Sequence, residues 1–268
     1  MFEDLSTNPR VEALLEGPSL WHRVEHHEQV GSTNDVALEA VRQGEPAGLV
    51  VVADRQLAGR GRAGRPWEDR ASPAGSAGSL LVTAVVPDPE TSGSLVPLAA
   101  GVAVADAVRR QGARPRLKWP NDVLLDGRKT AGVLVERHEV AGAHVLLVGM
   151  GINTDWRGVA RTGEQVEWTS VAEVSGRDVD RADLLVDLLR GLVTWLRSLS
   201  GDPLRLLVTY RDACDSIGRD VRVSFPDGDQ LTGRAVDLDH DGRLVVDAAQ
   251  GQVAVNAGDI EHLRPEAT

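Results

Sequence analysis

An arginine- and glycine-rich segment holds the densest group of side chains that could do chemistry. It reads Gly-Arg-Gly-Arg-Ala-Gly-Arg-Pro-Trp over residues 59–67. Arginines supply planar, forked donors that suit phosphate and carboxylate groups, and glycines let the backbone approach a ligand closely. A loop of this kind can close over an anionic substrate and exclude water. A flexible, solvated linker is the alternative, but Trp67 favours binding because its ring can stack on a base such as adenine.

Lysine is almost absent from the sequence. Of 29 basic residues only Lys118 and Lys129 are lysines, and the rest are arginines. In a chain with such a strong preference for arginine, these two positions are candidates for sites that need a compact ammonium group. Two lysines left by chance in ordinary loops are the alternative.

Both lysines lie in segments with further polar residues. The run Lys-Trp-Pro-Asn-Asp at 118–122 predicts a turn that brings Lys118 and Asp122 together, either for chemistry or as a simple salt-bridged turn. Lys129 leads into an apolar strand, where a charge needs a negative partner. The run Gly-Met-Gly-Ile-Asn at 149–153 is a weak dinucleotide fingerprint, because the third glycine is missing. We interpret it as a turn that places Asn153 at the rim of a pocket.

The composition limits the class of protein. With 268 residues, 42% of them hydrophobic, the chain can build one main domain and a small appendage. The net charge of −11 argues against a broad nucleic-acid surface, and the sequence shows neither a signal peptide nor an apolar run long enough to span a membrane. We therefore expect a cytoplasmic protein. The histidines lack zinc-site spacing; His26 and His27 are expected at a solvated strand edge, and Cys214 is expected as apolar filler near a helix end.

Periodicity predicts the elements that position these residues. Helices are expected at 32–43, 95–110, 181–199 and 204–213, and strands at 49–53, 79–86, 116–119, 122–125, 130–137 and 145–148. Asp126-Gly127 predicts a hairpin turn. Long loops are expected at 57–78 and 155–167. From residue 220 short strands alternate with Asp-Gly turns, which predicts a small β-barrel; the predicted domains are therefore 1–216 and 217–268.

Six segments, taken in order, resemble the bacterial biotin protein ligases. They are Gly-Ser-Thr-Asn from Gly31, Gln56, the arginine loop, Lys-Trp-Pro-Asn-Asp, Arg-Lys-x-Ala-Gly-Val-Leu-Val-Glu from Arg128, and Gly-x-Gly-Ile-Asn from Gly149. The resemblance covers residues 30–155 by motif, and both lysines fall inside it. It implies an α+β fold: a catalytic domain like that of class II aminoacyl-tRNA synthetases, with a mixed sheet and flanking helices, followed by a small SH3-like β-barrel.

The resemblance also implies an ATP-dependent ligase that forms biotinyl-5'-AMP, with Mg²⁺, and transfers biotin to a lysine of a biotin carboxyl carrier domain. Lys129, Lys118, Arg62 and Asp122 would be catalytic. The biotin site would comprise Ser32, Thr33, Asn34, Gln56, Arg60, Gly61, Arg62 and Lys129. The ATP site would comprise Arg60, Arg62, Arg65, Trp67, Lys118, Asn121 and Asn153. The metal ligands stay open.

Two other functions are considered beside this one. A lipoate–protein ligase uses the same reaction class, but the lipoate head has no ureido group, so polar Ser32, Thr33 and Gln56 would stay unpaired against it. A non-catalytic module that binds biotin or a nucleotide is disfavoured because both lysines and the arginine loop are present. About 30 residues precede the first motif, so we expect neither an N-terminal DNA-binding domain nor DNA as a partner; a homodimer is left open.

Overall fold

The computed structural model describes residues 3–17, 19–67, 69, 77–89, 92–161, 167–225, 227–256 and 258–263. The predicted loops at 57–78 and 155–167 lie partly outside these residues. Within them, no helix is long and apolar enough to cross a bilayer.

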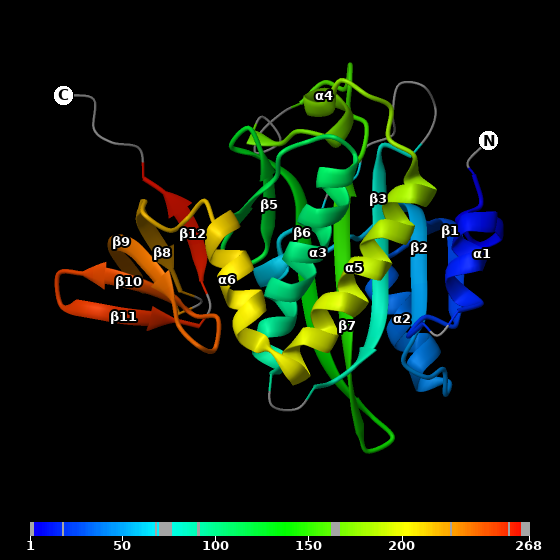
Figure 1. Cartoon of the computed structure of the whole chain (residues 1–268), viewed down its shortest axis with the longest axis horizontal. Helices are drawn as coiled ribbons and strands as arrows, with labels where there is room; N and C mark the ends of the chain where they lie inside the picture. Colours follow the sequence, from blue (N-terminus) through cyan, green and yellow to red (C-terminus); the bar gives the residue numbers. More distant parts are fainter. Residues whose placement is uncertain are drawn as a thin grey trace.

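A seven-stranded mixed sheet forms the centre of the molecule (Figure 1). Its strand order is β1-β2-β3-β7-β6-β5-β4, in which β1 and β2 are parallel and the other neighbours are antiparallel. The strands are β1 (Arg23–Val30), β2 (Leu49–Gln56), β3 (Ser79–Pro87), β4 (Arg116–Lys118), β5 (Asp122–Leu125), β6 (Arg128–Val140) and β7 (Ala143–Asn153).

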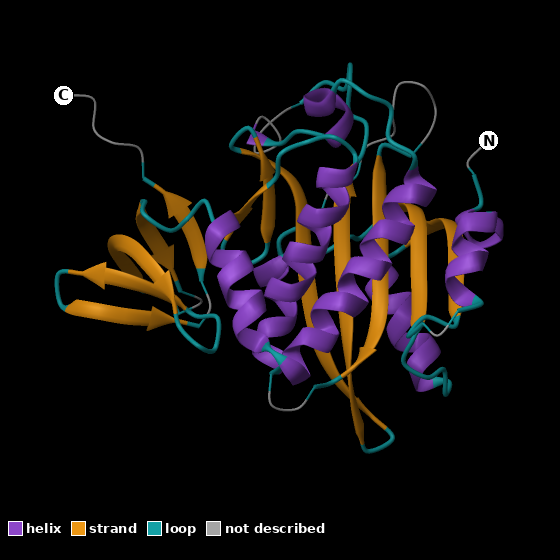
Figure 2. Cartoon of the chain, viewed as in Figure 1, coloured by secondary structure: helices purple, strands orange, loops and turns teal. Residues whose placement is uncertain are grey.

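Helices cover the two faces of this sheet unequally, as Figure 2 shows. One face carries α3 and α5 side by side, and the other carries α2. Alternate residues of each strand therefore enter different cores, since side chains alternate across a strand. Val50 and Val52 join the large core under α3 and α5, whereas Leu49 and Val51 pack with α2. The helices are α1 (Pro9–Leu15), α2 (Thr33–Arg42), α3 (Val96–Arg110), α4 (Val171–Ser175), α5 (Arg181–Gly201) and α6 (Pro203–Ala213).

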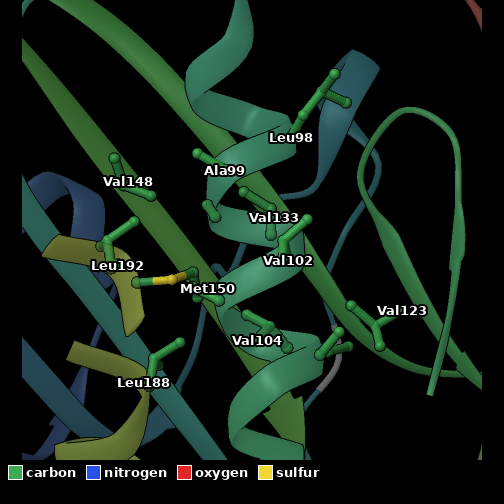
Figure 3. Packing of buried hydrophobic residues seen from close by; sticks show 14 of the residues in the cluster. Leu98, Ala99, Val102, Val104, Val123, Val133, Val148, Met150, Leu188 and Leu192 are labelled. Carbon is green, nitrogen blue, oxygen red and sulfur yellow. The ribbon is translucent and has the colours of Figure 1, made fainter. Parts of the chain in front are cut away.

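The large core explains the lengths of α3 and α5. Helix α3 is rich in alanine and valine, so it lies close to both the sheet and α5, with Ala99, Val102 and Val104 packed against β6, β7 and α5 (Figure 3). Helix α5 begins where the Asp180 side chain accepts hydrogen bonds from the amides of Ala182 and Asp183.

A second, five-stranded antiparallel sheet follows α6, with the order β11-β10-β9-β8-β12. Its core residues belong to the same cluster as those under α3 and α5. The indole nitrogen of Trp119 donates to the carbonyl of Gly242 at 2.9 Å, which ties the two sheets together. The strands are β8 (Asp220–Ser224), β9 (Gln230–Leu238), β10 (Leu244–Ala248), β11 (Gly251–Val255) and β12 (Asp259–His262).

Several local predictions are confirmed and others are wrong. The four predicted helices are present, and Asp126 and Gly127 form the hairpin turn between β5 and β6. The predicted turn at 149–153 is wrong, because these residues continue strand β7. His26 does lie on an edge strand, but the solvated environment is wrong: its side chain is only 5% exposed. Helix α1 and the full length of β1 were not predicted.

Candidate functional site

A cavity of about 1150 Å³ opens where the α2 face of the large sheet meets the second sheet. It gathers Arg60, Lys118 and Lys129, which come from three separate segments of the sequence. All predicted site residues line it except Asn153. They are Ser32, Thr33, Asn34, Gln56, Arg60, Gly61, Arg62, Arg65, Trp67, Lys118, Asn121, Asp122 and Lys129.

Two lysines and one aspartate form the charged centre of the cavity. Lys118 and Asp122 are register partners on β4 and β5, so the predicted proximity of these residues is confirmed. The ion pair, however, joins Lys129 to Asp122, with 2.7 Å between Nζ and Oδ1. Burial lowers the pKa of Lys118, and the nearby charges of Lys129 and Arg65 lower it further, while Asp122 opposes them. An anion entering here would meet two partly desolvated ammonium groups, which strengthens its attraction.

Glycines make room for Trp67, a buried residue that packs against the sheet with 8% of its surface exposed. A Cβ atom on Gly151 would lie 2.5 Å from the indole ring, and one on Gly132 would lie 3.0 Å from it. The two glycines are register partners on β7 and β6, so together they form a flat seat for the ring. This close packing is why β6 and β7 carry glycine at these two positions.

Trp168, which the sequence analysis missed, extends this aromatic surface. Its ring centroid lies 5.2 Å from that of Trp67 and 5.9 Å from that of Trp156. The Lys129 ammonium lies over both Trp67 and Trp168, at 5.3 and 5.5 Å from their centroids. Such contacts stabilise an ammonium group, and they orient Lys129 toward the cavity.

The arginine loop is held at both ends by carboxylates. Arg60 makes a bidentate pair with Asp35 of α2, at 2.8 and 2.5 Å. Arg65 pairs with Asp259 of β12 at 2.6 Å. Arg62 between them is half-buried, and burial lowers the pKa of its guanidinium although Asp259 and Asp122 lie nearby. The loop therefore spans from the large sheet to the second sheet and forms a wall of the cavity.

The other end of the cavity is polar and neutral. Ser32 caps α2 without a hydrogen bond from its side chain, so its hydroxyl is not used by the helix. The carbonyl oxygen of the Gln56 side chain accepts from the Thr33 amide at 2.7 Å. Asn34 donates to Glu136 at 2.6 Å. This end therefore presents hydroxyl and amide groups rather than charges.

The two predicted asparagines have different surroundings. Asn121 lines the cavity and donates to the carbonyl of Val133 at 2.9 Å, which fixes the crossing between β5 and β6. Asn153 is fully buried and donates to the carbonyl of Thr169 at 3.0 Å. The structure therefore does not bring Asn153 to the cavity rim, because β7 continues through this position and the side chain is bonded to Thr169 in the interior.

The second sheet contributes His262, which was also missed. Its Nε2 lies 2.9 Å from the Ser216 hydroxyl, and its Nδ1 lies 3.8 Å from Asp215. Burial, together with Lys118 and Arg219, lowers the pKa of His262 to about 4. Because the Ser216 oxygen already accepts from the Trp119 amide, its proton is free for a neutral imidazole. The histidine thus stays uncharged beside the lysines near neutral pH.

This depressed pKa predicts a pH dependence of stability. An unfolded histidine protonates near pH 6.5, whereas folded His262 protonates near pH 4, so its contribution is complete above about pH 6.5 and is lost as the pH falls toward 4. Between about pH 7 and about pH 5 we expect the wild type to lose about 2 kcal/mol of unfolding free energy through this group.

Urea unfolding of His262→Gln and of the exposed control His240→Gln at both pH values checks this expectation. The His262 variant should show a flatter profile, and the His240 variant should follow the wild type. Equal pH slopes for all three proteins would contradict the assignment.

Comparisons with known proteins identify the family of the chain. Residues 27–153 match the Biotin/lipoate A/B protein ligase family, and residues 216–263 match the Biotin protein ligase C terminal domain. The chain is 37% identical over 262 residues to the biotin--[acetyl-CoA-carboxylase] ligase of Mycobacterium tuberculosis, which covers 94% of this chain and 93% of that protein. It is 30% identical over 241 residues to the bifunctional ligase/repressor BirA of Bacillus subtilis, and this match covers 88% of this chain and 73% of that protein.

A solved structure shows the same arrangement. The biotin protein ligase from Aquifex aeolicus in complex with biotin and ATP superimposes with a TM-score of 0.75 at 25% identity, over 91% of this chain and all of that one. The fold is thus that of a protein ligase of the biotin/lipoate class. More narrowly, the chain belongs to the biotin protein ligase family, and its activity is the biotinylation of protein.

Proposed function

We propose that the cavity forms biotinyl-5'-AMP from biotin and ATP and then passes biotin to one lysine of a biotin carboxyl carrier domain. The observation that supports this proposal is the meeting of Lys118, Lys129 and the arginine loop at one cavity. Attack of a carboxylate on the α-phosphate brings two anions together, so cations must neutralise both in the transition state. The acyl adenylate hydrolyses readily, and a wall that excludes water protects it.

The residues divide between the two ends of the cavity. In this proposal Lys129 bridges the biotin carboxylate and the α-phosphate, and Lys118, Arg62 and Arg65 face the phosphates. Trp67 provides a surface for the adenine ring, and Trp168, which packs on it, extends that surface. The polar end, with Ser32, Thr33 and Gln56, receives the ureido ring. Gly61 lets the loop backbone approach this ring.

Mg²⁺ fits the donor set of the cavity. Magnesium ions in such enzymes are usually held by one or two carboxylates together with substrate phosphates. Asp122 supplies a carboxylate beside both lysines, and it would hold the ion against the phosphates. When bound, the ion would neutralise phosphate charge. In the second step Asp122 would orient the acceptor amine. Use of ATP and a carrier protein favours a cytoplasmic location.

Mass spectrometry of a carrier domain tests the proposal directly. The domain is incubated with the full chain, ATP, Mg²⁺ and either biotin or lipoate. We expect one biotinyl group on one lysine and no gain with lipoate, because the polar end would leave buried donors unpaired against a dithiolane. No mass gain with biotin, or equal gain with both acids, would overturn it.

A further inference from the structure

A chain of polar side chains runs from Glu136 to Gln56 beneath the polar end of the cavity. Two of its members, Thr83 and Glu136, do not line the cavity. Thr83 is fully buried on β3, and Glu136 is half-buried on β6. Their side chains reach the cavity residues Asn34, Thr33 and Gln56 only through hydrogen bonds.

The orientations of the two amides follow from their partners. Asn34 Nδ2 lies 2.6 Å from a Glu136 carboxylate oxygen, so the amide nitrogen must point to Glu136 and Oδ1 must point to Thr83. Gln56 Oε1 accepts from the Thr33 amide at 2.7 Å, so Gln56 Nε2 must point the other way. A Cβ on Gly149 would lie 2.6 Å from Asn34 Oδ1, which shows how tightly Asn34 is enclosed.

The hydroxyl protons can then be assigned by comparing their number with the number of oxygen–oxygen contacts that need one. Three oxygen–oxygen contacts follow in series: Thr83 to Asn34 at 2.6 Å, Thr83 to Thr33 at 2.8 Å, and Thr33 to Gln56 at 3.0 Å. Only two hydroxyl protons are available for them. The amide oxygen of Asn34 cannot donate, so it takes the proton of Thr83. The proton of Thr33 then has two acceptors within reach, and we assign it to the shorter contact, with Thr83 Oγ1 at 2.8 Å, rather than to Gln56 Oε1 at 3.0 Å. The longest contact, between Thr33 and Gln56, is left without a proton.

This unprotonated contact marks where a ligand N–H binds. Two facing oxygens with no proton between them repel each other, and an incoming N–H that donates to Thr33 Oγ1 or Gln56 Oε1 relieves this. Beside them, Gln56 Nε2 is a donor with no hydrogen-bond acceptor among the described residues. The chain therefore presents acceptors for an N–H group next to a donor for a carbonyl group, and a cyclic urea carries both groups side by side.

We infer that Glu136 and Thr83 are positioning residues that set the hydrogen-bond polarity of the ureido site by fixing Asn34, Thr33 and Gln56 from behind. The inference rests on the proposed placement of the biotin head at this end. An ionised carboxylate can only accept a hydrogen bond, so Glu136 fixes the amide nitrogen of Asn34 toward itself and the amide oxygen toward Thr83. Thr83 must then donate to Asn34, which leaves its oxygen as an acceptor for the Thr33 hydroxyl.

Binding of biotin to four full-length variants tests the inference. Thr83→Val removes the hydroxyl at constant shape and should weaken biotin binding about 10- to 100-fold, because it leaves Asn34 Oδ1 unsatisfied. Thr83→Ser should restore binding to within about 3-fold. Glu136→Gln should weaken it about 5- to 20-fold, since an amide holds Asn34 without a charge. The control is Thr130→Val. Thr130 is a fully buried threonine that takes no part in this series of hydrogen bonds, so the variant should bind biotin as the wild type does.

The KM for ATP, measured by pyrophosphate exchange, separates positioning from general damage. We expect it to stay within about 2-fold of wild type in all four variants. Wild-type biotin affinity in Thr83→Val, no rescue by serine, or parallel losses for biotin and ATP would each overturn the inference. If Thr83→Val does not fold, Glu136→Gln decides, because it leaves the core unchanged. Failure of the wild type to bind biotin would instead contradict the proposed function.

Discussion

Replacement of Lys129 by alanine should lower the rate of adenylate formation by about 10²–10³, the scale expected for loss of one group that stabilises transition-state charge. Lys129 is held at 2.7 Å from Asp122 and lies over two tryptophan rings, so its ammonium is fixed before substrates arrive. Its loss also leaves the Asp122 carboxylate without its partner, which repels an incoming anion. Biotin-dependent exchange between ATP and pyrophosphate measures this step alone.

Two further variants make the Lys129 result interpretable. Lys129→Arg keeps the charge but not the compact ammonium, so it should recover only part of the rate. Arg128→Ala, one residue earlier in the same strand, should retain the wild-type rate. An exchange rate in Lys129→Ala within about 3-fold of wild type would remove this residue from the mechanism.

Replacement of Asp54 by alanine should lower the free energy of unfolding by about 3–5 kcal/mol, the usual cost of breaking a buried ion pair from one side. The Asp54 side chain is fully buried, with Arg181 at 2.7 Å and His26 at 3.1 Å. Burial by itself would raise the pKa of Asp54, but the hydrogen bond from His26 and the charge of Arg181 outweigh it, and the pKa is lowered.

The same pair predicts an acid-dependent loss of stability. Because the folded pKa of Asp54 lies below its unfolded value, its contribution is present above about pH 4 and disappears as the pH falls through the folded pKa. Chemical denaturation measures both effects. Asp183→Ala, which breaks an exposed pair with Arg10, should cost under about 1 kcal/mol. An equally small change in Asp54→Ala would show that the buried cluster contributes little.

Elements with a clear period and local stop signals could be predicted from the sequence. Helix α5 has apolar residues at helical spacing behind Asp180, and the β5–β6 turn has Asp126-Gly127. Helix α1 also has such a signal, since Asn8 caps it and Pro9 begins it, but its seven residues are too few to show a period. Strand β1 could not be recognised by alternation, because His26 takes an inward position that distant partners, Asp54 and the Leu5 amide, make favourable.

The strand at 149–153 was mistaken for a turn because glycine usually marks one. The structure gives another reason for its glycines: Trp67 and Asn34 occupy the space where their side chains would lie. The alternation of glycine with Met150 and Ile152 was the available signal, since both apolar residues are buried on the opposite face. Such a pattern of small and large residues indicates a strand with something packed closely on one side.

The cavity could be predicted only where one segment carries several polar residues together. The arginine loop and the lysine segments are of this kind, and the structure brings them together. Trp168 and His262 are single residues in stretches without other site signals. His262 reaches the cavity because β12 pairs with β8 and the second sheet shares its core with the first. Tertiary contacts between distant segments, rather than local sequence, decide such positions.

The shared core and the lining of the cavity together have a consequence for synthesis of the enzyme. The residues around the cavity extend from Ser32 to Leu263, and Asp259, which anchors Arg65, also lies on β12. A nascent polypeptide therefore carries an unfinished wall and an unanchored arginine loop until β12 has left the ribosome. Synthesis must therefore pass Leu263 before the lining of this cavity is complete.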